Sequence, residues 1–144
     1  MTTRTRRDKP LDVVVTGEAE SWLPALETVV GPRFINAWKA DNERELLDAV
    51  ERGPAEAAVL DEGVHSEVPV LQMLRLIRRV KPRMPVIVVT THTDRRWLEN
   101  ALRLAAFSVV TKPMGFELLL RQLQRVMNRL DRTLREGGPM GNRN

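Results

Sequence analysis

The chain has 144 residues, of which 42% are apolar and 29% charged, values typical of one soluble globular domain. It contains no cysteine, which excludes disulfides and thiolate chemistry, and it has no apolar run near the ~20 residues of a membrane span. The net charge of +4 arises from 23 Lys and Arg against 19 Asp and Glu, mixed along the chain, so we expect no direct nucleic-acid contact and no membrane partner. Residues 1–10 are basic without the apolar stretch of a secretory signal, and we therefore expect a cytoplasmic protein.

Short β-branched runs alternate along the chain with segments whose apolar residues recur at helical spacing. The clearest strand is MPVIVVTT (84–91), which carries no charge. Asn42 with Glu45 resembles a capping box at a helix start, and Gly31 is placed to end a helix. The predicted strands are 11–16, 33–40, 55–61, 84–91 and 107–111, and the predicted helices are 21–30, 42–54, 68–80, 94–106 and 115–136.

Strict alternation of strands and helices predicts an α/β domain, a parallel sheet with helices on both faces. Right-handed crossovers restrict this pattern to a doubly wound fold, in which the chemistry lies beyond the carboxyl ends of the strands. We expect one domain over 11–136 with an extended last helix, between a flexible basic N-terminus (1–10) and a disordered tail (137–144).

Polar residues stand at these strand ends. The first strand ends in TGEAE (16–20), the third in Asp61, the fourth in Thr90 and the fifth in Lys112. A carboxylate can act as a nucleophile towards phosphorus, and the transferred group then needs positive charge and hydrogen-bond donors around its oxygens. The predicted fold brings a carboxylate, a hydroxyl and an ammonium to one edge of the sheet.

Three stretches carry a resemblance to a known family. AVLDEG (58–63), IRRVKPRMPVIVVTT (77–91) and ALRLAAFSVVTKPM (101–114) resemble the receiver domains of response regulators in two-component signalling. The resemblance runs from about Leu11 to Met127. It implies a flavodoxin-like five-stranded sheet in the order 2-1-3-4-5.

The resemblance also implies roles. Asp61 matches the phosphorylated aspartate, Thr90 the hydroxyl residue that bonds the phosphoryl group, and Lys112 the lysine that contacts both. We expect a phosphoprotein of a phosphorelay that is not itself an enzyme. It would take a phosphoryl group from a sensor histidine kinase, or respond to another signalling protein, and act through protein–protein contacts. Lys112 should lie within salt-bridge reach of Asp61.

The sequence departs from the family at the end of the first strand, where receivers carry an acidic pair that holds Mg²⁺. Here the place is taken by Thr16 and Gly17 or, shifted by one, by Gly17 and Glu18. Mg²⁺ prefers carboxylate and phosphate oxygens in near-octahedral geometry, so we expect weak or absent binding, through Asp61 and Glu18. Val109 also stands where the family usually has an aromatic switch residue.

These departures keep a second function open, a phosphorylation-independent pseudo-receiver that acts as a binding or dimerisation module. A Rossmann-type cofactor enzyme fits poorly, since the first strand is followed by a single glycine, Gly17, where phosphate cradling requires several. His65 and His92 show no ligand spacing, and we expect both to be isolated loop residues.

The last helix carries apolar residues beyond the length that the sheet needs. The core should be used up near Met127, yet Leu130 and Leu134 follow at helical spacing. They either pack on their own domain or form a short seam of a homodimer through the fourth and fifth helices.

Overall fold

The computed structural model describes residues 9–17, 22–62, 69–112 and 116–136. The predicted tail at 137–144 and most of the N-terminal segment lie outside these residues. The elements are β1 (Leu11–Thr16), α1 (Leu23–Val30), β2 (Ile35–Lys39), α2 (Glu43–Glu51), β3 (Ala57–Asp61), α3 (Val70–Val80), β4 (Val86–Thr90), α4 (Arg95–Arg103), β5 (Ser108–Thr111) and α5 (Phe116–Glu136).

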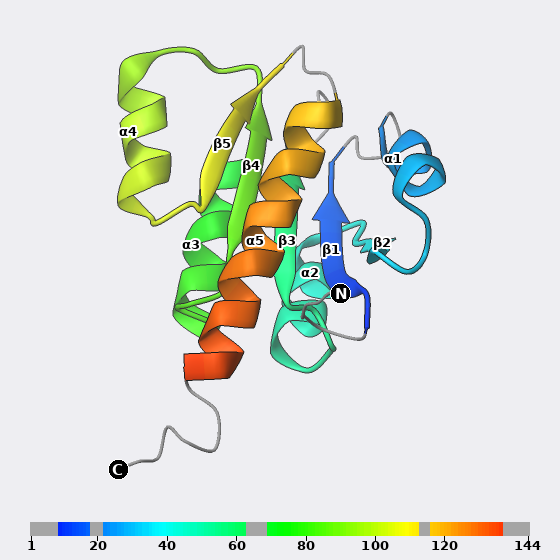
Figure 1. The fold of residues 1–144 in the computed structure, drawn as a ribbon. Coiled ribbons are helices and arrows are strands. Elements are labelled where there is room, and N and C mark those ends of the chain that lie inside the picture. Colours follow the sequence, from blue (N-terminus) through cyan, green and yellow to red (C-terminus); the bar gives the residue numbers. More distant parts are fainter. Residues whose placement is uncertain (1–8, 18–21, 63–68, 113–115, 137–144) are drawn as a thin grey trace.

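The strands form one parallel sheet in the order β2-β1-β3-β4-β5 (Figure 1). The doubly wound α/β fold and its strand order are therefore confirmed. All carboxyl ends lie at the same edge, because every neighbouring pair is parallel.

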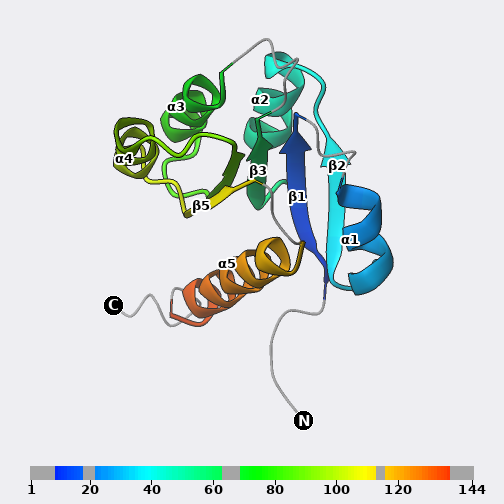
Figure 2. The same ribbon diagram turned by 90° about the horizontal axis from the view of Figure 1, so that it is seen from above.

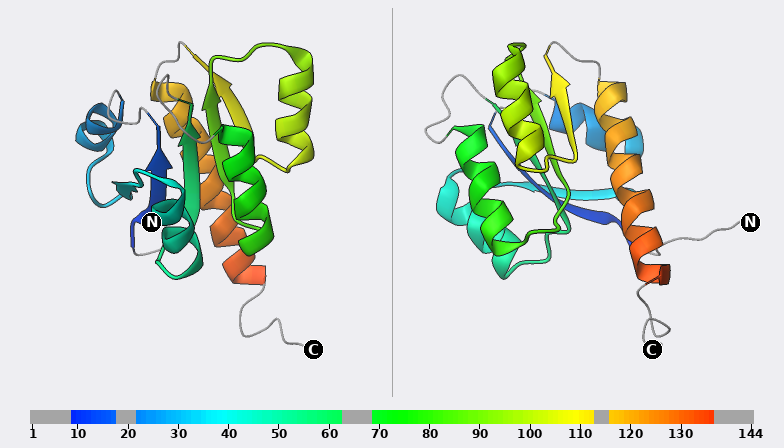
Figure 3. Two further views of the ribbon diagram at one scale, coloured as in Figure 1. Left: turned by 180° about the vertical axis from the view of Figure 1, so that it is seen from behind. Right: turned by 90° about the vertical axis from the view of Figure 1, so that its left-hand side faces the viewer.

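Helices cover both faces of the sheet, α1 and α5 on one and α2, α3 and α4 on the other (Figures 2 and 3). Alternation along the strands supplies a core to each face. Val13 and Val15 pack in the cluster that contains Leu26 and Leu123 of α1 and α5, whereas Val14 packs in the cluster of α2 and α3. Strands buried on both sides explain the continuous apolar runs of the sequence.

Local signals place several helix ends. Asn42 Oδ1 accepts the Glu45 N–H at 2.9 Å, while Glu45 Oε1 accepts the Asp41 N–H at 2.8 Å, so the capping box closes one residue further back than its usual form. Gly31 follows α1 with a φ of 78°, a conformation that glycine adopts without strain. The predicted helix 21–30 begins two residues late, at Leu23.

The last helix packs on its own domain further than expected. Leu119, Leu123 and Val126 are fully buried, and Leu130 is partly buried against the same cluster. The core therefore continues past Met127, and Leu130 contributes to it. The side chain of Leu134 lies outside the described residues. Among the helices described, none is both long and apolar enough to cross a membrane.

Candidate functional site

The candidate site lies at the edge of the sheet where the strands have their carboxyl ends, over β3, β4 and β5. Asp61 ends β3 opposite Val89, and Thr90 ends β4. Lys112 follows β5 and donates its backbone N–H to the Thr90 carbonyl at 2.8 Å, which extends the ladder by one residue. The fold thus brings together the three residues that the sequence predicts for the site.

Lys112 reaches across β4 to Asp61. Two strand spacings correspond to about 10 Å, a gap that the long lysine side chain closes. Its Nζ lies 2.6 Å from Asp61 Oδ1, which confirms the predicted contact. The Lys112 ammonium has three donor hydrogens, and it also donates to the Glu62 carbonyl at 3.1 Å. The Asp61 side chain is 0% exposed and that of Lys112 21%, so this is a largely buried pair.

The other carboxylate oxygen has a partner that the sequence did not indicate. Trp22, just before α1, donates its indole Nε1–H to Asp61 Oδ2 at 2.5 Å. Its side chain is buried, at 8% exposed. The two residues are 39 positions apart, and an aromatic residue at the start of an apolar helix is ordinarily read as core. Asp61 therefore meets a cation at one oxygen and a neutral donor at the other.

Gly17 lies against the backbone of Asp61. Its φ is +74°, and a Cβ built on it would stand 1.6 Å from the Asp61 carbonyl oxygen. No side chain, acidic or otherwise, fits there without backbone movement. Thr16 beside it is 3% exposed, and its hydroxyl has no hydrogen-bond partner among the described residues.

The described residues Thr16, Gly17 and Asp61 do not fit a magnesium site. Glu18, the second ligand that the sequence predicts, lies outside the described residues. Asp61 is the remaining predicted ligand, and both its oxygens are engaged. Within the described part of the chain, no group of three or more His, Cys, Asp or Glu side chains is placed to hold a metal ion.

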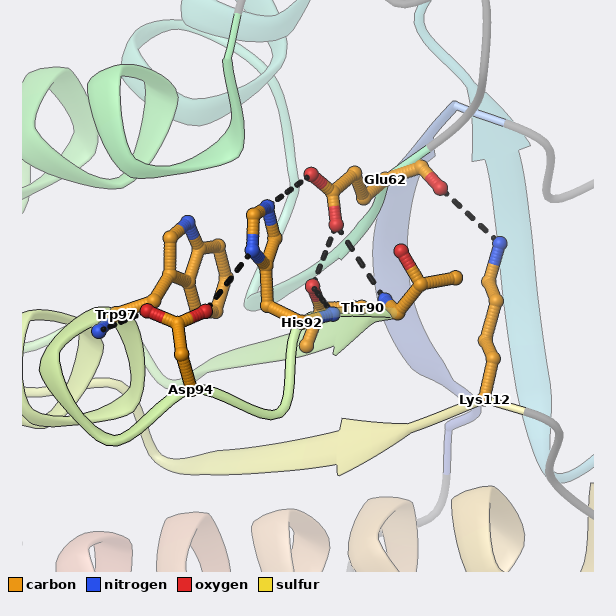
Figure 4. Close-up of polar contacts among 7 residues, drawn as sticks. Glu62, Thr90, His92, Asp94, Trp97 and Lys112 are labelled. Carbon is orange, nitrogen blue, oxygen red and sulfur yellow. Dashed lines mark hydrogen bonds and ion pairs between the residues drawn. The ribbon is translucent and has the colours of Figure 1, made fainter.

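Thr90 belongs to a second polar cluster, formed with Glu62 and His92 (Figure 4). The Thr90 hydroxyl donates to Glu62 Oε1 at 2.5 Å and accepts the His92 backbone N–H at 3.0 Å. His92 Nε2 lies 3.0 Å from Glu62 Oε2. The hydroxyl expected to face a phosphoryl group is thus directed at Glu62.

His92 connects this cluster to α4. Its ring stacks on Trp97 at 4.5 Å between centroids with 8° between planes, and Nδ1 lies 3.3 Å from Asp94 Oδ1 (Figure 4). The backbone N–H of Trp97 and the His92 ring lower the pKa of the Asp94 carboxyl, which caps α4. The expectation that His92 is isolated is therefore wrong, because residues beyond its own loop contact it; His65 lies outside the described residues.

Comparisons with known proteins show the family and the fold of the chain. The sequence pattern of the response regulator receiver domain matches residues 13–124. A protein of Rickettsia felis named as an NtrX-like response regulator is 28% identical over 116 residues, which are 80% of this chain and 24% of that protein. The chain thus spans about a quarter of the length of the curated relatives it matches.

Solved structures share the fold. A CheY-like receiver domain protein from Methanospirillum hungatei has a TM-score of 0.73 at 15% identity, covering 86% of this chain and 98% of the other. The receiver domain of NtrC4, solved as a beryllofluoride-activated dimer, has a TM-score of 0.70 at 21% identity, with 82% and 97% covered.

Proposed function

Because the chain belongs to the response regulator receiver domain family, we propose that it accepts a phosphoryl group on Asp61 and passes the signal on through protein–protein contacts in the cytoplasm. The donor would be a sensor histidine kinase. The observation that carries this proposal is the ion pair of 2.6 Å between Lys112 and Asp61, which sets a cation beside the carboxylate at the family's phosphoacceptor position.

The proposed chemistry is an in-line transfer. An Asp61 carboxylate oxygen would attack phosphorus, forming a P–O bond while the P–N bond to the kinase imidazole breaks and that ring takes up a proton from water. Lys112 would stay beside the new phosphoryl group and offset its charge. The Thr90 hydroxyl would have to leave Glu62 to donate to the phosphoryl oxygens.

A second candidate is the phosphorylation-independent module. It is favoured by the burial of Asp61, whose side chain is 0% exposed and has both oxygens engaged, and by the position of Gly17. In that case Asp61, Lys112 and Trp22 would stabilise one fixed conformation, and partner binding alone would set the output.

A second copy of the chain is one partner that we propose. The NtrC4 receiver domain is described as a dimer, and a pairing through α4 and α5 would use the two helices that contact β5. Since Leu130 packs on its own domain, the apolar part of such an interface would come from side chains such as Leu102 of α4, which is 60% exposed.

Incubation with a small-molecule phosphodonor separates the two candidates. If Asp61 is the acceptor, intact-mass measurement will show one added phosphoryl group on the wild-type chain and none on Asp61→Asn. Asp48→Asn, which changes an exposed carboxylate on α2, is the matched control and should still be labelled. Failure to label the wild-type chain by a small donor or by any purified histidine kinase would favour the second candidate.

A further inference from the structure

We infer that Trp22 and Lys112 hold the Asp61 carboxylate in place of a bound divalent cation, so that Asp61 works without Mg²⁺. Trp22 is in this view a positioning residue of the site. The part that concerns phosphoryl transfer rests on the proposed function, whereas the part that concerns the carboxylate and the metal stands on the geometry alone.

Charge and hydrogen bonding support the inference that Lys112 and Trp22 hold the Asp61 carboxylate. The ammonium of Lys112 lies 2.6 Å from Oδ1 and balances the charge of Asp61. The indole of Trp22 lies 2.5 Å from Oδ2 and can only donate, so it suits an ionised oxygen and no metal. A divalent cation would therefore have to displace a cation and a buried donor from an already neutral pair.

The lack of room for a side chain at Gly17 supports the inference that no divalent cation is bound beside Asp61. Gly17 occupies the position from which a receiver would extend a metal-binding carboxylate. A Cβ at this position would lie 1.6 Å from the Asp61 carbonyl oxygen, so the position has no room for a side chain. Its positive φ disfavours a side chain independently of that contact. Thr16 presents a buried neutral hydroxyl. The two positions of the family's acidic pair thus hold a buried neutral hydroxyl and a close backbone contact, while Trp22 donates to Asp61.

The consequence concerns the charge that develops during transfer. A site that relies on protein donors already in place needs no ion to neutralise the acceptor. Lys112 supplies the positive charge, and the Trp22 N–H fixes the orientation of the carboxylate so that the rotation of Asp61 is restricted. Transfer to Asp61 should then proceed at the same rate whether Mg²⁺ is present or chelated.

The indole signals of the full chain test the contact directly. The chain has three tryptophans, so ¹⁵N labelling gives three indole N–H signals that Trp→Phe variants assign. We expect the Trp22 signal to lie furthest downfield, to exchange slowly with solvent, and to shift upfield in Asp61→Asn. Mg²⁺ titration to tens of millimolar should leave it in place. A saturable shift at low millimolar Mg²⁺, or no response to Asp61→Asn, would overturn the inference.

Phosphodonor labelling with and without a chelator tests the metal independence. We expect equal initial rates, within about twofold, in Mg²⁺ and in EDTA. Trp22→Phe should lower the rate about tenfold, the loss expected for one hydrogen bond to a charged group, while Trp38→Phe on β2 should not. Labelling that requires Mg²⁺ would contradict the inference.

The two proposals fail in different ways. If no label appears under either condition, phosphoryl acceptance at Asp61 is wrong, and the indole and Mg²⁺ measurements still decide whether Trp22 and Lys112 replace the cation. If labelling appears and the Trp22 signal ignores Asp61→Asn, the function holds and the positioning role of Trp22 is wrong.

Discussion

At the scale of single residues, the site shows which contacts a sequence can reveal. Asp61, Thr90 and Lys112 stand at strand ends, so topology alone predicts that they converge, and the structure has Lys112 on Asp61 at 2.6 Å. Trp22 carried no such signal, because nothing in its own segment distinguishes a donor to a carboxylate from a packed aromatic side chain. The hydroxyl of Thr90 also points elsewhere than expected, since that depends on the Glu62 rotamer.

Gly17 supplies a first prediction at this scale. Gly17→Ala should destabilise the domain by about 2–4 kcal/mol, because the new Cβ would meet the Asp61 carbonyl and the residue would keep a positive φ. Urea unfolding followed by circular dichroism measures the loss. Gly53→Ala is a weaker comparison, since its Cβ would lie 2.8 Å from the Ala49 carbonyl and its φ is not positive. A Gly17→Ala midpoint equal to wild type would show that the loop moves freely away from Asp61.

A second prediction at the scale of single residues concerns Lys112. Lys112→Ala leaves a carboxylate of 0% exposure without its cation, and we expect a loss of about 3–5 kcal/mol in the free energy of unfolding. The exposed Lys81→Ala should stay within about 0.5 kcal/mol of wild type. Adding Asp61→Asn to Lys112→Ala should recover part of the loss, because the buried charge is then gone. Equal stability of Lys112→Ala and Lys81→Ala would contradict the buried ion pair.

At the scale of elements, the connection between β4 and α4 is more ordered than its sequence indicates. His92 lies between the Glu62 carboxylate that follows β3 and the Asp94 carboxylate that caps α4, and it stacks on Trp97. Strand and helix signals predict the bounds of the flanking elements within about three residues, whereas the loop conformation depends on partners from another strand. The end of β4 is thereby linked to α4 by side chains on both sides of the loop.

We expect His92→Ala to break that link. The indole N–H signal of Trp97 should shift as the ring current of the imidazole is lost, while the signals of Trp22 and Trp38 stay in place. The cost in stability should be about 1 kcal/mol, typical of one side-chain contact of this kind. Thr93→Ala, an exposed neighbour, is the control and should leave all three signals unchanged. An unmoved Trp97 signal in His92→Ala would argue against the stack.

At the scale of the whole molecule, the alternation of elements determined most of what was predicted. Ten alternating segments, apolar on the right faces, predict a doubly wound sheet with a core on each side, whereas the strand order came from the resemblance to receiver domains. What the pattern could not supply were the close approaches between segments far apart in the chain, such as Gly17 on Asp61. The length of the core along α5 was also underestimated, because Leu130 still finds apolar neighbours there.

Assembly is the last property of the whole molecule that we predict. If α4 and α5 form a homodimer interface, Leu102→Asp should weaken self-association at least about tenfold, because a charge would be buried where an apolar side chain was. Val29→Asp is the matched control, with 59% exposure against 60% for Leu102, and α1 lies at the opposite side of the molecule from α4 (Figures 1 and 3). Multi-angle light scattering across micromolar concentrations measures the self-association of each variant. A wild-type monomer throughout that range would contradict the homodimer, and an equal loss of self-association in both variants would place its interface elsewhere. Because Leu130 is partly buried, Leu130→Asp would also unfold the core, so it cannot distinguish an interface from a packing defect.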